Sequence, residues 1–147
     1  MEDNELRQAI AAMESYKERV EALSRQVQVL RVSLEEVTMS SDALKAFKNA
    51  KEGDDIMVPV GASSFITVKV TSNRNVVVGI GSNISVEKDI DDAISYMDAN
   101  NAEIAEALKK SAETLNEAQQ ALTTISNAVQ QEYVNRQQAA QGIQRVG

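Results

Sequence analysis

The sequence predicts an α+β fold, a long antiparallel α-helical coiled-coil hairpin that carries a central block of two β-hairpins. Two observations predict it. Apolar residues recur at alternating steps of three and four near both ends of the chain, and between these stretches the step changes to two. An average step of 3.5 keeps one apolar seam facing a partner helix. Neither stretch can bury its seam alone, so we expect the chain to reverse in the middle and pair its own two ends.

The first helix is expected at about residues 3–52, where Asp3 or Asn4 can cap its start. Gly53 follows its expected end at Lys51–Glu52, and lysines in the last turns suit the negative end of the helix dipole. Its apolar seam consists of Leu6, Ala9, Met13, Tyr16, Val20, Leu23, Val27, Leu30, Leu34, Val37 and Leu44, with Ser41 as the single interruption.

The middle of the chain, residues 55–87, is expected to form four short strands. Alternation of apolar and polar residues marks the segments 55–60 and 65–70, a short β-branched run marks 76–80, and a last short strand is expected at 84–87. The segments between them are rich in Gly, Ser and Asn, which favour tight turns, so the block is interpreted as two β-hairpins. Pro59 cannot donate a hydrogen bond to a neighbouring strand and places the first strand at a sheet edge or a strand end.

The strand block is also the candidate oligomerisation surface. Four short strands cannot bury a two-sided apolar ribbon, and their open edges invite pairing with a second copy or with a related chain. The apolar residues expected at this surface are Val58, Val60, Phe65, Ile66, Val68, Val70, Val76, Val77, Val78, Ile80 and Val86. A charge at Val68 or Val78 is expected to separate the subunits.

The second helix is expected at residues 88–147, with Asp89 or Asp91 as its cap. Its seam consists of Ile90, Ile94, Met97, Ile104, Leu108, Leu115, Ala118, Leu122, Ile125, Val129, Ala139, Ile143 and Val146, with polar Asn101, Ser111, Glu132 and Arg136 in the same register. If Leu44 lies near Ile94, antiparallel pairing puts Leu6 near Glu132. The turns beyond that point then have no partner in the same chain, and we expect this end to be frayed or loosely paired. At 147 residues, the whole chain is expected to form one domain.

Apolar side chains near the two ends of the chain are candidates for contact with another protein. They lie where pairing is expected to be weakest, and partly separated helix tips would expose apolar surface. The candidate residues are Leu6, Ile10, Met13, Val129, Tyr133, Ile143 and Val146. Met13 lies on the seam, so an ordinary place in the coil core is the simpler interpretation for it.

Composition and charge argue against several classes of function. The net charge of −7 disfavours binding to nucleic acid or to an anionic membrane surface, both of which attract basic proteins. The absence of Cys and His removes disulfides, thiolate chemistry and histidine-based catalytic or metal sites. No stretch approaches the about 18 apolar residues that a membrane span needs, and the acidic start lacks the features of a secretory signal. We therefore expect a cytoplasmic protein that is not an enzyme and needs no cofactor.

The strand block resembles a known family. Residues Met57–Ile66, Val76–Gly81 and Val86–Lys88 resemble the alpha subunits of archaeal prefoldin, and Ile90–Ile94 resembles the entry into the C-terminal helix of that family. Ser63 stands where many relatives are expected to have glycine. The resemblance implies an ATP-independent holdase in which two alpha-type and four beta-type subunits assemble through their strands. It further implies that the helix tips capture unfolded protein clients and pass them to a group II chaperonin.

Three other functions remain open from the sequence. The main alternative is a structural or filament-forming coiled-coil protein that assembles through the same strands. A second is an adaptor with a helical hairpin on a β-domain, although in such adaptors the helices are inserted between strands. A third is an acidic regulator of one folded basic partner, since nine acidic residues crowd positions 87–117. A solvated helix face with acid near a helix N-terminus explains those residues more simply.

Overall fold

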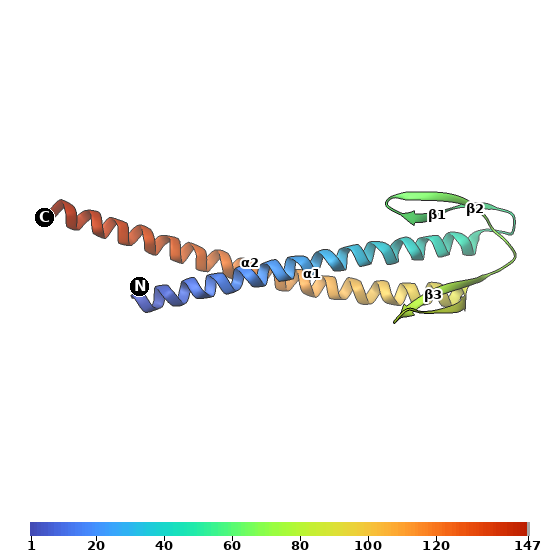
Figure 1. Ribbon diagram of the computed structural model, residues 1–147, viewed down its shortest axis with the longest axis horizontal. Helices are drawn as coiled ribbons and strands as arrows, with labels where there is room; N and C mark the ends of the chain where they lie inside the picture. The colour runs from blue at the N-terminus through green and yellow to red at the C-terminus, as the bar shows by residue number, and fades with distance from the viewer. Residues whose placement is uncertain (147) are drawn as a thin grey trace. The chain divides into compact units, whose positions relative to one another are not determined.

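The computed structural model describes the backbone of residues 1–146 and the side chains of residues 1–143. Its elements are α1 (Asp3–Asn49), β1 (Asp55–Gly61), β2 (Ser64–Lys69), β3 (Asn75–Gly81), β4 (Ile84–Asp89) and α2 (Ile90–Val146), as Figure 1 shows. Two long helices thus flank two small antiparallel hairpins, and the fold class predicted from the change in apolar spacing is confirmed. Helix α1 ends at Asn49, shortly before its expected end at Lys51–Glu52.

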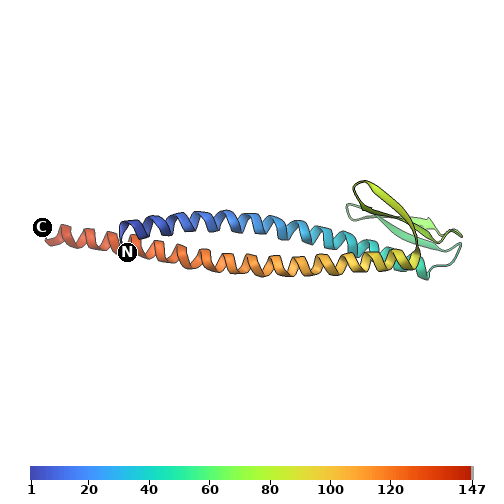
Figure 2. The ribbon, with the colours of Figure 1, turned by 90° about the horizontal axis from the view of Figure 1, so that it is seen from below.

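The chain divides into two compact units, which are described separately. Unit 1 comprises Met1–Gln28 together with the chain from Leu108 onward, and unit 2 comprises Val29–Ala107. Unit 1 therefore contains only segments of the two helices. Unit 2 contains the end of α1, both hairpins and the start of α2. Figures 1 and 2 show the hairpins at the end of unit 2 where α1 finishes and α2 begins.

Polar pairs join the two helices of unit 2 in an antiparallel register. Ser41 Oγ donates a hydrogen bond to Asp98 Oδ1 at 2.7 Å, and Asn101 Nδ2 donates to Thr38 Oγ1 at 2.8 Å. Lys48 Nζ and Asp91 Oδ1 lie 2.7 Å apart. From one pair to the next, the residue number rises along α1 by as much as it falls along α2, as in an antiparallel pair of helices. The pairs lie on both sides of Leu44 and Ile94, in agreement with the register expected from the sequence.

Ser41, the one polar interruption of the first seam, is buried with 4% of its surface exposed. Its hydroxyl bond to Asp98 satisfies a group that would be costly to bury alone. That bond is the largest cause that lowers the pKa of Asp98 below its ordinary value, and the ammonium group of Lys45 at 3.4 Å lowers it further. Ser41 therefore joins the helices with a polar contact at a position where the seam would otherwise require an apolar one.

Each hairpin is a separate two-stranded sheet, β1 with β2 and β3 with β4. The two-residue turns Ala62–Ser63 and Ser82–Asn83 have φ values between 49° and 60°. Positive φ at both central positions defines a type I′ turn, whose twist matches that of the flanking strands. Asn tolerates this conformation, whereas Ala and Ser adopt it at a steric cost. Ser63 thus occupies a left-handed position that glycine would fill without strain.

Arg74, in the connection between the hairpins, caps the end of α1. Its guanidinium donates to the carbonyl oxygens of Phe47 at 3.0 Å and Ala50 at 2.8 Å and lies 5.3 Å from the centre of the Phe47 ring. A cation at this place also complements the negative end of the helix dipole. Helix α2 is capped at its start by Asp89. The Asp89 carboxylate accepts a 2.8 Å hydrogen bond from the amide of Asp92, and Asp89 is one of the two caps that the sequence predicts.

The core of unit 1 follows the predicted seam. Leu6, Val27, Ala118 and Val129 are its buried apolar residues among those described, each with 8% or less of its surface exposed. Beyond Arg136, every residue of α2 whose side chain is described is exposed, although the backbone continues as helix to Val146. The expectation that this end is frayed stays a prediction.

Replacing the first turn by Asn-Gly, as Ala62→Asn with Ser63→Gly, should stabilise the protein by about 1 kcal/mol. A left-handed residue with a Cβ costs roughly 1–2 kcal/mol, and Asn and Gly avoid most of that cost. Thermal unfolding should show a higher midpoint. Ser85→Gly in β4 is the matched control and should lower it, because Ser85 lies in an extended strand where glycine adds only freedom to the unfolded chain. Equal shifts of the unfolding midpoint in both variants would contradict the prediction that the left-handed turn residues are strained.

The carboxyl pKa of Asp98, measured by NMR, should rise in Ser41→Ala and rise less in Lys45→Ala. Because folding lowers this pKa, ionised Asp98 contributes stability above its unfolded pKa of about 4, and that stability is lost as the pH falls through the folded value. As the pH falls below about 4, the free energy of unfolding of Ser41→Ala should therefore decrease less than that of the wild-type protein. A larger rise in Lys45→Ala would show that charge, and not the hydroxyl, governs this group.

Candidate oligomerisation and binding surfaces

The β1–β2 hairpin presents apolar side chains on both of its faces. Cross-strand partners share a face, so Ile56 with Val68 and Val58 with Ile66 lie on one side and Met57 with Thr67 on the other. The first side borders a cavity of about 370 Å³ whose lining includes Leu44, Phe47, Ile56, Val58, Val68 and Val76. Met57 is 63% exposed. The hairpin therefore faces α1 across this cavity, and part of its apolar surface stays uncovered.

The β3–β4 hairpin divides its apolar residues more sharply between its two faces. Val78 is buried, with only 1% of its surface exposed. Its cross-strand partner Val86 is half-buried. Val77, one residue away, points to the opposite face and is 71% exposed. On the inner side the Nζ of Lys88 lies 5.5 Å from the centre of the Tyr96 ring on α2, which fixes that face of the hairpin against the helix.

The residues that the sequence assigns to oligomerisation thus have different environments. The exposed ones are Val60, Phe65, Ile66, Val77 and Ile80; the half-buried ones are Val58, Val68, Val76 and Val86; Val70 and Val78 are buried. The interpretation of the strands missed two residues, Met57 and Ile84, which are 63% and 54% exposed. Met57 alternates with the chosen Val58, whereas Ile84 lies two residues from the chosen Val86, so the period of two places Ile84 on the face of Val86 and could have identified it.

The strand edges are the second feature of this surface. Within the described residues no third strand joins either sheet, so each of the four strands keeps one edge without a backbone partner. Free N–H and C=O groups along such an edge can pair with a strand of another chain. Together with the exposed apolar side chains, the edges form a surface suited to association between subunits.

The candidate binding residues near the chain ends are also not equivalent. Leu6 and Val129 are buried with 8% and 5% exposed, and Ile10 and Met13 are half-buried. Tyr133 and Ile143 are 50% and 75% exposed. The side chain of Val146 lies outside the described residues. Among the candidates whose side chains are described, Tyr133 and Ile143 therefore offer the large exposed apolar surface.

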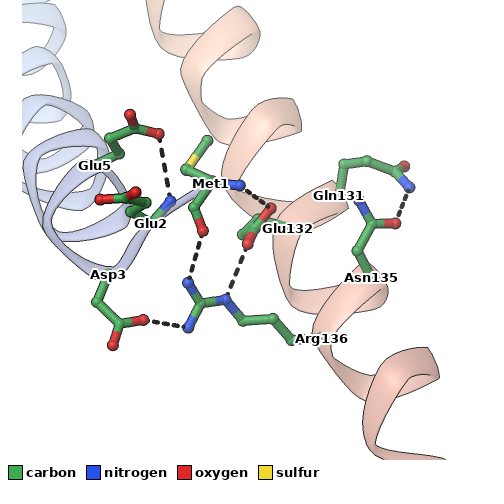
Figure 3. Close-up of polar contacts among 8 residues, drawn as sticks. All are labelled: Met1, Glu2, Asp3, Glu5, Gln131, Glu132, Asn135 and Arg136. Carbon is green, nitrogen blue, oxygen red and sulfur yellow. Dashed lines mark hydrogen bonds and ion pairs between the residues drawn. The ribbon is translucent and has the colours of Figure 1, made fainter. Parts of the chain in front are cut away.

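Glu132 and Arg136, which interrupt the second seam, form a polar clasp with the start of α1 (Figure 3). Arg136 Nη1 donates to Asp3 Oδ1 at 2.8 Å, Arg136 Nη2 to the carbonyl oxygen of Met1 at 3.1 Å, and Arg136 Nε to Glu132 Oε1 at 3.0 Å. In the apolar spacing these residues are only breaks in the seam, and the spacing does not reveal their contacts. Their spacing of four, typical of an ion pair on one helix face, was the available signal.

The described residues hold no group of three or more Asp, Glu, Cys or His side chains placed to bind a metal ion. Neither helix, as far as Val146, has a stretch that is both long and apolar enough to cross a membrane.

Comparison with known proteins identifies relatives along most of the chain. A family model described as prefoldin subunit matches residues 5–135. The prefoldin alpha subunit of Methanothrix thermoacetophila is 32% identical over 108 residues, which cover 74% of this chain and 71% of that one. The alpha subunit of Pyrococcus horikoshii is 30% identical over 110 residues, with 74% of each chain covered.

A solved structure adds evidence for the fold alone. The crystal structure of the prefoldin beta subunit from Thermococcus strain KS-1 covers 87% of this chain and 91% of its own, with a TM-score of 0.57 and 13% sequence identity.

Val77→Asp should leave the free energy of unfolding within about 0.5 kcal/mol of wild type, whereas Val78→Asp should lower it by about 3 kcal/mol or more. The first charge stays in solvent, and the second is buried without a partner. Chemical unfolding followed by circular dichroism measures both. A charge at Val78 is therefore expected to disrupt the hairpin itself, so Val77 is the better position for testing assembly. Equal destabilisation would show that the two faces are not distinct.

Proposed function

Because the chain belongs to the prefoldin family, whose members are chaperone subunits, we propose that it is the alpha-type subunit of a cytoplasmic ATP-independent holdase. Two copies assemble with four beta-type subunits through the β-hairpins. The hexamer captures non-native polypeptides at the ends of its helices and delivers them to a group II chaperonin. The established family supports the chaperone role; the stoichiometry, the clients and the chaperonin are part of the proposal.

The observation that carries the proposal is the lack of backbone partners and of apolar cover in the strand block. Both sheets have open edges, and Met57, Phe65 and Val77 expose half or more of their apolar surface. A two-stranded hairpin is marginally stable in water unless further strands or packed helices cover it. Strands from neighbouring subunits would supply both the missing backbone partners and the missing apolar cover. Assembly with a second copy and with beta-type subunits is the arrangement that meets both needs.

Capture at the helix ends is supported by the exposed apolar residues of unit 1. Tyr133 and Ile143 present apolar surface beside a neutral, glutamine-rich segment. One such end would bind an unfolded chain weakly. Several ends in one assembly would bind it together with a much higher apparent affinity, because the second contact becomes intramolecular. Weak individual contacts also permit release without ATP.

The proposal is tested by mixing the purified chain with a beta-type prefoldin subunit and adding a denatured, unrelated protein without ATP. A hexamer that suppresses aggregation of the denatured protein supports it. Sedimentation of the same mixture tests the main alternative, because a filament-forming protein would polymerise through the same strands. Filaments without suppression would favour the structural function and overturn the chaperone proposal.

Tyr133→Ser combined with Ile143→Ser should weaken capture of a denatured client about thirtyfold or more while the assembly stays intact. Each substitution removes exposed apolar area that contributes roughly 1 kcal/mol or more when a client covers it. Val29→Ser is the matched control, since Val29 is 64% exposed in unit 2, away from the helix ends. Fluorescence anisotropy of a labelled client measures the affinity. Equal losses in both variants would show that capture is not confined to the ends.

A further inference from the structure

The polar clasp of unit 1, defined by Asp3, Glu132, Arg136 and the carbonyl oxygen of Met1, concentrates three contacts on one side chain. Three different nitrogens of Arg136 donate to three different acceptors: Asp3 at the start of α1, Met1 just before it, and Glu132 on α2. Figure 3 shows the guanidinium lying between the two helices, with Asp3 and Glu132 on different sides of it. One planar group therefore bridges two helix segments that are far apart in the sequence.

The clasp lies where the buried part of unit 1 ends. Val129 is the last buried residue of α2 among those described, and Leu6 is the first of α1. Glu132 follows Val129 by one helical turn and is only 13% exposed at its side chain. From Asn135 to Ile143 all described side chains are exposed. The clasp is thus the outermost contact that holds the two helix segments of this unit together.

The clasp is also a contact that solution conditions can weaken. The Arg136 and Asp3 side chains are 40% and 80% exposed, so salt screens their attraction. Hydrogen bonds to Asp3, and next to Glu132, raise the pKa of Arg136 above its ordinary value, so the cation persists under all ordinary conditions. Salt concentration, and not pH near neutrality, is the variable that acts on the guanidinium. Helix ends with few buried contacts open at low cost.

We propose that the Arg136 clasp gates the apolar end of unit 1. While it is closed, Leu6 and Val129 stay covered; when it opens, they join Tyr133 and Ile143 as surface that an apolar segment of an unfolded protein can contact. The gate rests on the proposed function for its purpose, since it regulates the same client-binding end. Its opening is a property of the chain that can be measured without a client.

Opening is measured by the reactivity of a cysteine at Val129. The chain contains no cysteine, so Val129→Cys creates a single thiol at a buried position. Its rate of reaction with a maleimide, divided by that of Ala128→Cys at an exposed neighbouring position, reports how often the end opens. Adding Arg136→Gln should raise this ratio about fivefold, the effect expected from loss of a partly exposed ion-pair network. Raising NaCl from about 0.05 to 0.5 M should raise the ratio more when Arg136 is present than in Arg136→Gln, where only the ion pair between the Met1 ammonium and Glu132 remains to be screened.

Two further variants separate the clasp from general effects of charge. Arg25→Gln removes an exposed arginine of the same unit with the same change of net charge, and should leave the ratio unchanged. Asp3→Asn removes one negative charge from the clasp but keeps an oxygen that can accept from Arg136, and should give an intermediate increase. A ratio that does not change in Arg136→Gln, or that changes equally in Arg25→Gln, overturns the gate.

Client capture supplies the second readout. In the assembled protein, Arg136→Gln should bind a denatured client several-fold more tightly at low salt than wild type, and the difference should disappear at high salt. If wild type captures no client, the proposed function fails while the thiol ratio still decides whether the clasp opens. If capture occurs and Arg136→Gln binds no more tightly, the clasp does not regulate it and the gate is overturned.

Discussion

The need of each helix to cover its apolar seam is the constraint on which the rest of the structure depends. A seam with an average step of 3.5 requires a partner, and the chain supplies one by reversing between α1 and α2. The reversal is made by two hairpins with short, tight turns. Those hairpins in turn leave their own edges and outer faces uncovered. Pairing the two helices thus leaves strand edges and apolar strand faces uncovered, and another subunit can cover them.

Polar residues placed in the seams give the pairing its register. Leu, Val and Ala at successive seam positions would tolerate a shift of the helices along each other by one heptad. Ser41 in unit 2 and Glu132 in unit 1 have partners that exist in one alignment only. A single polar residue at a core position is known to select register at some cost in stability. The interruptions of the apolar pattern are therefore informative features of the packing.

Much of the fold was predictable because it depends on local chemistry. Alternation of apolar and polar residues marks β1 and β2, and a β-branched run marks β3. Asp89 caps α2 because its carboxylate accepts a hydrogen bond from the first turn. The candidate surfaces were less predictable. A period of two separates Val77 from Val78 but does not say which of the two faces α2, since that depends on how the hairpin docks. Two of the three partners of Arg136, Asp3 and Met1, come from the other end of the chain, and no pattern near residue 136 reveals them.

The contact of Arg74 with the end of α1 has a mechanical consequence. Its guanidinium is bound to two carbonyl oxygens of the helix while its backbone belongs to the segment that joins the hairpins. A force that displaces this segment must either break both bonds or unwind the last turn of α1. Displacement of the segment between the hairpins is therefore resisted by the last turn of α1 within unit 2.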